Sequence, residues 1–162
     1  MNAFTDLAHI FMSITDTNPW RGTPVERYYG LNPASKGSKG EEIVSALLTE
    51  KGYQVLPGVN SGHNRMVNNV KTEIKIALAT NRNTNFECIF NHIGLQKDWE
   101  QILFVCVNGD GQIKGTMFNK GTLPMELLNR QQGGKRSGND DYMVNATHSA
   151  ALLGHRQGTI LW

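Results

Sequence analysis

The clearest hydrophobic pattern in the chain lies in residues 70–78, which alternate in the manner of a half-buried β-strand. The residues expected to face a core are Val70, Thr72, Ile74, Ile76 and Leu78. The opposite face of the strand then carries Lys71, Glu73 and Lys75. Residues 64–68 predict a partner strand, and Asn68-Asn69 predicts the turn of a hairpin between the two.

Other segments predict the helices and strands around this hairpin. The predicted helices cover residues 3–15, 38–51 and 123–128, with a short helical turn at 25–29. The further predicted strands cover residues 53–56, 101–108 and 112–118. Ser38 is placed to cap the second helix, and the tail from Tyr142 shows no clear pattern. This order indicates an α/β fold with a mixed central sheet flanked by helices.

Composition narrows the class of protein. A chain of 162 residues is expected to form a single domain, residues 1–162. Its net charge of +2 excludes a whole-protein field that would attract nucleic acid, so any such surface must be local. Cys88 and Cys106 lie in apolar runs and are expected to be buried free thiols. Without an apolar stretch of membrane-spanning length or a signal pattern, we expect a cytoplasmic protein and no membrane partner.

Four short motifs follow one another at a suggestive spacing. They are Lys36–Glu41 at a helix start, Ser61–Asn64 before a strand, Glu73-Ile74-Lys75, and the buried strand 101–108. Together they resemble the PD-(D/E)XK, or restriction-endonuclease-like, nuclease superfamily, whose common core would span about residues 37–108. The stretch from Leu56 to Lys75 is most similar to small type II restriction enzymes. Glu41 is similar to its counterpart in archaeal Holliday-junction resolvases.

The resemblance implies a role for each motif. Asn64, Glu73 and Glu41 would stand at the metal-binding positions, and Lys75 would position the attacking water and offset charge on the phosphate. The implied cofactor is Mg²⁺, with Mn²⁺ as a substitute and Ca²⁺ as an ion that binds without turnover. Mg²⁺ suits this set because it prefers carboxylate, water and phosphate oxygens.

Asn64 departs from the family pattern, because no Asp lies between Lys51 and Lys75. Three explanations are open. The chain is an engineered, inactive form in which Asn64 replaces a catalytic Asp, or the natural site uses Asn64 or His63, or the protein only binds DNA. The first is favoured because the other positions are intact and Asn is the isosteric replacement for Asp.

Several other polar residues are candidates for DNA contact. The Asn-rich loop after the catalytic strand contains Asn81, Arg82, Asn83 and Asn85. Asn and Arg suit base edges in the major groove, although Asn is also a common turn former. Lys135 and Arg136 lie in a Gly-rich loop that either binds phosphates or is simply solvated. Gln96 is either near the site or merely a polar residue before the buried strand. An HNH site using His63 and His92 lacks the further ligands that it needs.

The sequence therefore predicts a Mg²⁺-dependent endonuclease that hydrolyses DNA, most specifically a type II restriction enzyme. A palindromic duplex calls for a two-fold symmetric protein, so a homodimer is expected. The alternatives are a structure-specific or nicking nuclease of the phage or resolvase type, and a catalytically inactive DNA-binding module.

Overall fold

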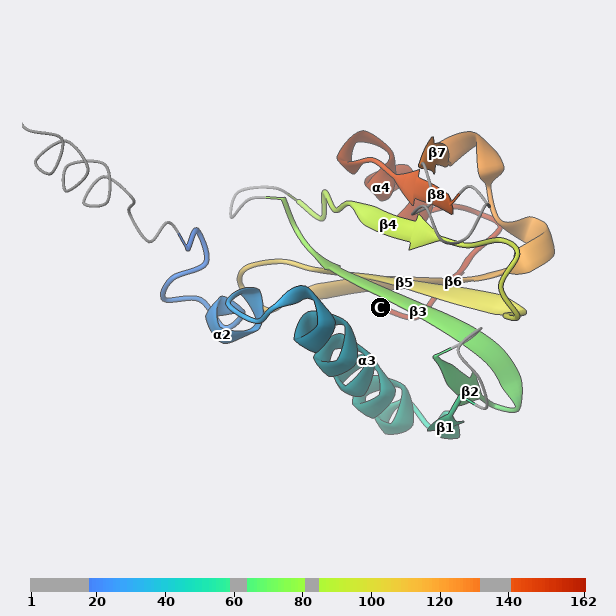
Figure 1. The fold of residues 1–162 in the computed structure, drawn as a ribbon, viewed down its shortest axis with the longest axis horizontal. Coiled ribbons are helices and arrows are strands. Elements are labelled where there is room, and N and C mark those ends of the chain that lie inside the picture. The colour runs from blue at the N-terminus through green and yellow to red at the C-terminus, as the bar shows by residue number, and fades with distance from the viewer. Residues whose placement is uncertain (1–17, 59–63, 81–84, 132–140) are drawn as a thin grey trace, which may run out of the picture.

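A computed structural model describes residues 18–58, 64–80, 85–131 and 141–162, with the elements shown in Figure 1. The helices are α2 (Glu26–Tyr29), α3 (Pro33–Glu50) and α4 (Ala146–Leu153), with 3-10 turns η1 (Lys120–Thr122) and η2 (Met125–Leu127). The strands are β1 (Val55–Pro57), β2 (Arg65–Val67), β3 (Val70–Leu78), β4 (Phe90–Ile93), β5 (Gln101–Val107), β6 (Ile113–Asn119), β7 (Asn129–Gln131), β8 (Asp141–Val144) and β9 (Thr159–Ile160). The helix expected at residues 3–15 lies outside the described residues.

The main sheet is mixed, as the order of elements predicted. Its six strands run in the order β1-β2-β3-β5-β6-β9. Only the β3–β5 pair is parallel, and the other neighbours are antiparallel. The interior of β5 is buried on both faces, which explains its continuous apolar run. The protein is therefore an α/β protein built around a mixed central sheet.

The hairpin expected between residues 64 and 78 is confirmed. β2 and β3 pair antiparallel, with Val67 opposite Val70. Asn68 and Asn69 have φ values of 48° and 63°, so both central residues of the turn are left-handed. A two-residue turn of this kind matches the twist of the flanking strands, and Asn tolerates the left-handed region better than most residues.

Helix α3 covers one face of the main sheet (Figure 1). The residues that form this core are Val44, Leu48, Val67, Ile74, Leu103, Val105 and Met117. The helix begins at Pro33, five residues before the predicted cap at Ser38, so that prediction is wrong. Asn32 is the cap instead, because its side chain accepts a hydrogen bond from Ser35 N and Pro33 suits the first helical position.

The opposite face is covered by a second sheet, which the sequence did not predict. This sheet has the order β4-β8-β7, and α4 packs beside it. Its core includes an edge-to-face series in which Phe104 lies 5.0 Å from Phe90 and 6.1 Å from Phe118, between ring centroids. The helix predicted at residues 123–128 is reduced to the turn η2, which starts after Pro124.

The two cysteines correct another expectation. Cys88 and Cys106 are fully buried, as expected, but they form a disulfide rather than free thiols. Their Cα atoms lie 6.1 Å apart because Cys88 pairs with Ala79, just after β3, and Cys106 lies opposite Ala77 on the neighbouring strand β5. One argument for a cytoplasmic location is thereby removed, and that location stays a prediction. No helix in the described ranges is long and apolar enough to cross a membrane.

Candidate functional site

A large concave feature of the described residues lies along an open edge of β3. On β3, strand β2 pairs only with Val70–Thr72, and the described residues provide no neighbouring strand for the rest of β3 on that side. A cleft of about 860 Å³ follows this edge, and residues 73–80 all contribute to it. One wall comes from α2 and α3, and the other comes from Ile89, which precedes β4, and from Asn91 on β4. Figure 1 shows β3 running between α3 and β4.

Glu73 and Lys75 share one face of β3, as the two-residue period predicted. Lys75 Nζ lies 3.3 Å from Glu73 Oε1. The side chain of Glu73 is only 8% exposed and that of Lys75 only 19% exposed. A carboxylate so deeply buried requires a compensating charge, and the ammonium group supplies it.

The side-chain amide of Asn64 is hydrogen-bonded to the same strand. Its Oδ1 accepts a 2.7 Å hydrogen bond from Ile74 N, and its own backbone N donates to Thr72 O at 3.0 Å. The side chain therefore occupies part of the edge that β2 leaves open. Within the described ranges, Nδ2 has no hydrogen-bond acceptor. Asn64 thus lies beside Glu73 in the cleft, as the spacing of the motifs predicted.

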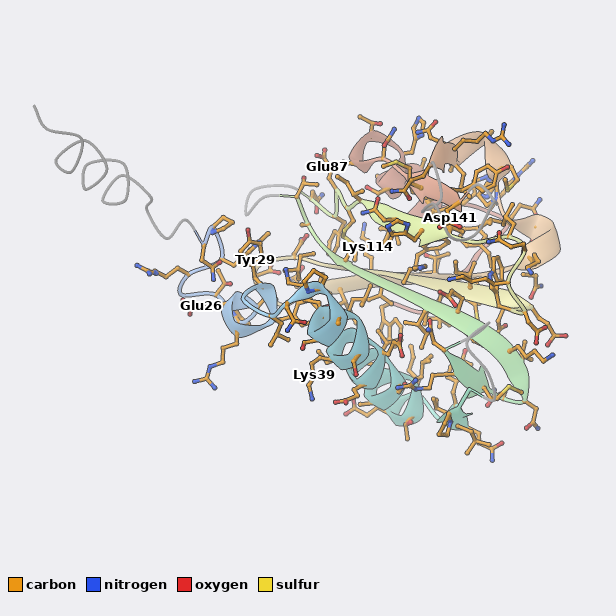
Figure 2. The ribbon with its side chains drawn as sticks, viewed as in Figure 1. Glu26, Tyr29, Lys39, Glu87, Lys114 and Asp141 are labelled. Carbon is orange, nitrogen blue, oxygen red and sulfur yellow. A yellow bond between two sulfur atoms is a disulfide. The ribbon has the colours of Figure 1, made fainter. Side chains whose placement is uncertain are left out.

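Glu41 reaches the cleft because α3 packs unusually close to β3. Gly40 makes this possible, since a Cβ at this position would overlap Ile76 Cγ2 and lie 2.8 Å from the Tyr28 hydroxyl. Glu42 instead points to solvent and pairs with Lys39 at 2.6 Å. Figure 2 shows Lys39 on the side of α3 away from the sheet. The structure therefore selects Glu41, rather than Glu42, as the residue that faces the site.

Arg65 is a site residue that sequence reasoning missed. Its Nη1 lies 3.1 Å from Glu41 Oε2 and donates to Asn64 O at 2.8 Å, while its Nε donates to Ser45 Oγ at 3.1 Å. The guanidinium therefore joins α3 to the start of β2. Its position directly after Asn64, on the strand face toward α3, was the signal in the sequence that could have identified it.

Burial and charge act together on Glu41. Burial raises the pKa of its carboxyl above the ordinary value, and the nearby negative charge of Glu73 acts in the same direction. The positive charges of Arg65 and Lys75 oppose this shift. The sensitivity of Glu41 to Glu73 and Lys75 indicates that groups from α3 and β3 share one electrostatic environment.

The oxygen atoms of this group are of the kind that Mg²⁺ prefers. Two carboxylates, Glu41 and Glu73, and the amide oxygen of Asn64 line the same cleft. Each carboxylate, however, already has a cationic partner, Arg65 or Lys75. Two negative and two positive charges give this set a net charge of zero. The described residues contain no group of three or more His, Cys, Asp or Glu placed to hold a metal ion.

The remaining candidates are less closely connected to this cleft. Asn85 lines a different hollow, beside Phe86 and Lys114. Gln96 is exposed and does not line the cleft. The other candidates, His63, Asn81, Arg82, Asn83, Lys135 and Arg136, lie outside the described residues.

The cleft also contains residues that the sequence did not indicate as site residues. Tyr29, labelled in Figure 2, and Lys36 lie at its α2 end. The Lys36 ammonium lies 4.7 Å from the centre of the Tyr29 ring. Asn91 lies on the β4 wall. Its neighbour His92, considered for an HNH site, instead has Nδ1 3.4 Å from Asp141 Oδ2.

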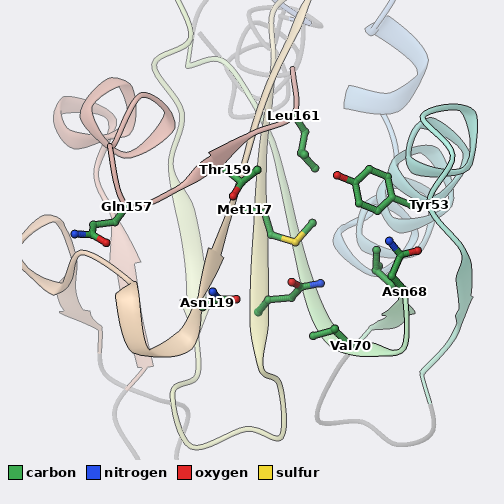
Figure 3. Close-up of a pocket in the computed structure, with 10 residues that line it drawn as sticks. Tyr53, Asn68, Val70, Met117, Asn119, Gln157, Thr159 and Leu161 are labelled. Carbon is green, nitrogen blue, oxygen red and sulfur yellow. The ribbon is translucent and has the colours of Figure 1, made fainter.

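A separate hollow of about 300 Å³ lies between the end of α3 and the strands of the main sheet (Figure 3). Its lining is uncharged and includes Tyr53, Asn68, Met117, Asn119, Gln157 and Leu161. It contains none of the predicted site residues, so the β3 cleft is the better candidate site. Comparisons of the chain with models of protein families and with curated proteins found no match.

Proposed function

We propose that this chain is a restriction-endonuclease-like nuclease that hydrolyses DNA phosphodiester bonds with Mg²⁺, most specifically a homodimeric type II restriction enzyme. One observation carries the proposal. Glu41 from α3, Asn64 before β2, and Glu73 and Lys75 from β3 line one cleft at the open edge of the sheet. Glu41 and Glu73, 32 positions apart in the sequence, therefore line the same cleft, and this supports the proposal.

The residues of the chain have distinct roles in this proposal. Glu73 and Glu41 would hold the cation, with the oxygen of residue 64 beside them. The cation would polarise the phosphodiester and lower the pKa of water. Lys75 would orient the attacking water and offset the charge that develops on the phosphate. Arg65 would keep the Glu41 side chain directed at the cleft through their 3.1 Å ion pair.

A DNA-binding module without catalytic activity is the second candidate. The specific observation in its favour is the pairing of both carboxylates, Glu73 with Lys75 and Glu41 with Arg65. With Asn64 neutral, no net negative charge remains on these groups to attract a divalent cation. The two candidates make opposite predictions for the Asn64→Asp variant.

Plasmid cleavage separates the candidates. Supercoiled plasmid of known sequence is incubated with Mg²⁺ and either the chain or its Asn64→Asp variant. Discrete bands from the variant support a restriction enzyme, and a smear supports a nonspecific nuclease. A double variant that also carries Glu73→Gln is the control, because it should cut nothing. If Asn64→Asp cuts no better than the chain itself, the explanation by a replaced Asp fails, and if neither protein cuts, the nuclease proposal fails and the binding module remains.

A further inference from the structure

Strand β4 carries an irregularity at the wall of the cleft. Phe90 pairs with Val144 and Ile93 pairs with Tyr142, so β4 advances three residues where β8 advances two. His92 has a φ of 55°, in the left-handed region that a non-glycine residue rarely adopts. The extra residue is a β-bulge, a device that commonly redirects side chains beside functional sites.

The bulge changes which side chains face outward. Regular alternation would bury one of two successive residues, but the pattern from Phe90 to Ile93 is buried, exposed, exposed, buried. Asn91 is thereby presented at the cleft that also contains Glu73 and Lys75. Its side chain is exposed at this wall.

The side chain of Gln131, on β7, forms hydrogen bonds to the backbone of His92 and to the Asn91 amide. Its Oε1 accepts a 2.9 Å hydrogen bond from His92 N, the backbone group that the bulge leaves free of the ladder. Its Nε2 then lies 3.5 Å from Asn91 Oδ1, a long hydrogen bond. The Gln131 amide is therefore fixed by the backbone and in turn orients Asn91. Among the residues that the structure describes, Asn91 has no other side-chain hydrogen bond, which leaves one lone pair of its Oδ1 and both hydrogens of its Nδ2 for a ligand.

Ile89 supplies an apolar contact on the same wall. It lies two residues before Asn91 and is 42% exposed in the cleft. A large aliphatic side chain exposed beside a supported amide is a combination that matches an A·T pair. Adenine offers N7 as acceptor and N6 as donor to a single amide, and thymine offers its methyl group to an apolar side chain.

We propose that Ile89 and Asn91 read an A·T base pair in the major groove of duplex DNA, with Gln131 as the positioning residue for Asn91. This inference rests on the proposed function, because it assigns base recognition to the β4 wall of the same cleft. It names a reader different from the Asn-rich loop at residues 81–85, which the sequence suggested.

Selection from random duplexes tests the proposal without any cleavage. The chain, with Asn64 in place and no Mg²⁺ added, is mixed with a library of random duplexes at low salt, and the bound fraction is sequenced. The same selection is made with Asn91→Ala, Gln131→Ala and the control Asn119→Ala. Asn119 is an exposed asparagine on β6 that does not line the cleft.

We expect the chain to enrich a sequence that contains an A·T pair, and we expect the Asn119→Ala control to enrich the same sequence. Asn91→Ala should lose discrimination at that pair by roughly 10- to 100-fold, with little change in binding to unselected DNA. Gln131→Ala should lose part of it, whereas a purely structural role would weaken all sequences alike. If Asn91→Ala selects the same sequence as the control, the inference is wrong and the nuclease proposal stands. If the chain binds no duplex at all, both are wrong.

Discussion

Replacing Asn64 with Asp changes the charge of the candidate site with little change in its shape. Asn64 Oδ1 accepts the 2.7 Å hydrogen bond from Ile74 N, and a carboxylate oxygen can accept the same bond. The Nδ2 group that is lost donates no hydrogen bond to a described residue. The variant should therefore fold like the parent chain, and its effects can be attributed to the added negative charge.

The expected gain in cation affinity follows from the charge balance. The carboxylates of Glu41 and Glu73 are neutralised by Arg65 and Lys75, so the new carboxylate gives the group a net charge of −1. Two unit charges about 4 Å apart attract by about 1 kcal/mol in water and about 4 kcal/mol at a protein surface. A divalent ion doubles this attraction, and desolvation offsets part of it. We expect Mg²⁺ to bind about 2–4 kcal/mol more tightly, or about 30- to 1000-fold in Kd.

Calorimetric titration with Mg²⁺ and with Ca²⁺ measures this gain directly. Thermal unfolding provides a second readout, since a cation that binds only the native state raises Tm by an amount that grows with the logarithm of its affinity. Asn119→Asp is the matched control, because it adds the same charge on β6 outside the cleft. Asn64→Ala completes the set by removing the hydrogen bond to Ile74 N without adding charge.

The reasoning predicts that only Asn64→Asp gains both cation affinity and plasmid cleavage. Equal gains in affinity for Asn64→Asp and Asn119→Asp would mean that the ion responds to overall charge and not to the cleft. A gain in affinity without cleavage would leave a cation site but refute the assignment of Glu73 and Lys75 to catalysis.

Three further predictions concern the framework of the site. Gly40→Ala should be about 1–3 kcal/mol less stable in urea unfolding than Gly37→Ala, because a Cβ at Gly40 would overlap Ile76 whereas one at Gly37 has no neighbour within 4 Å. Equal stabilities of the two variants would contradict the close packing of α3 against β3. Burial raises the pKa of Glu41, so the native state holds this proton more tightly than the unfolded state, and the free energy of unfolding falls as pH rises just above 4.5. Urea unfolding at a series of pH values should show a flatter dependence of this free energy on pH for Glu41→Gln. An unchanged dependence would exclude Glu41 as the cause. Reductant should lower the free energy of unfolding by about 3 kcal/mol, because the disulfide joins cysteines 18 residues apart in the sequence. Equal free energies of unfolding with and without reductant would mean that both thiols are free.

The sequence by itself determined the features that depend on neighbouring residues. The period of two in residues 70–78 placed Glu73 and Lys75 on one face of a strand, and Asn68-Asn69 fixed the turn before it. The continuous apolar run in β5 marked a strand buried on both faces. Such features follow from backbone geometry and local burial, so they can be read along the chain without knowing what packs against it.

Only the tertiary structure decided how distant segments meet. The close approach of α3 at Gly40 selected Glu41 over Glu42, and the fold made Arg65 its partner. The crossover before β5 joined the two cysteines, and the second sheet formed the cleft wall that carries Asn91. Each of these contacts joins residues far apart in sequence, so its energy depends on the completed packing and leaves no periodic signal in the chain. The same packing set the charge balance around Asn64, which the motifs alone could not reveal.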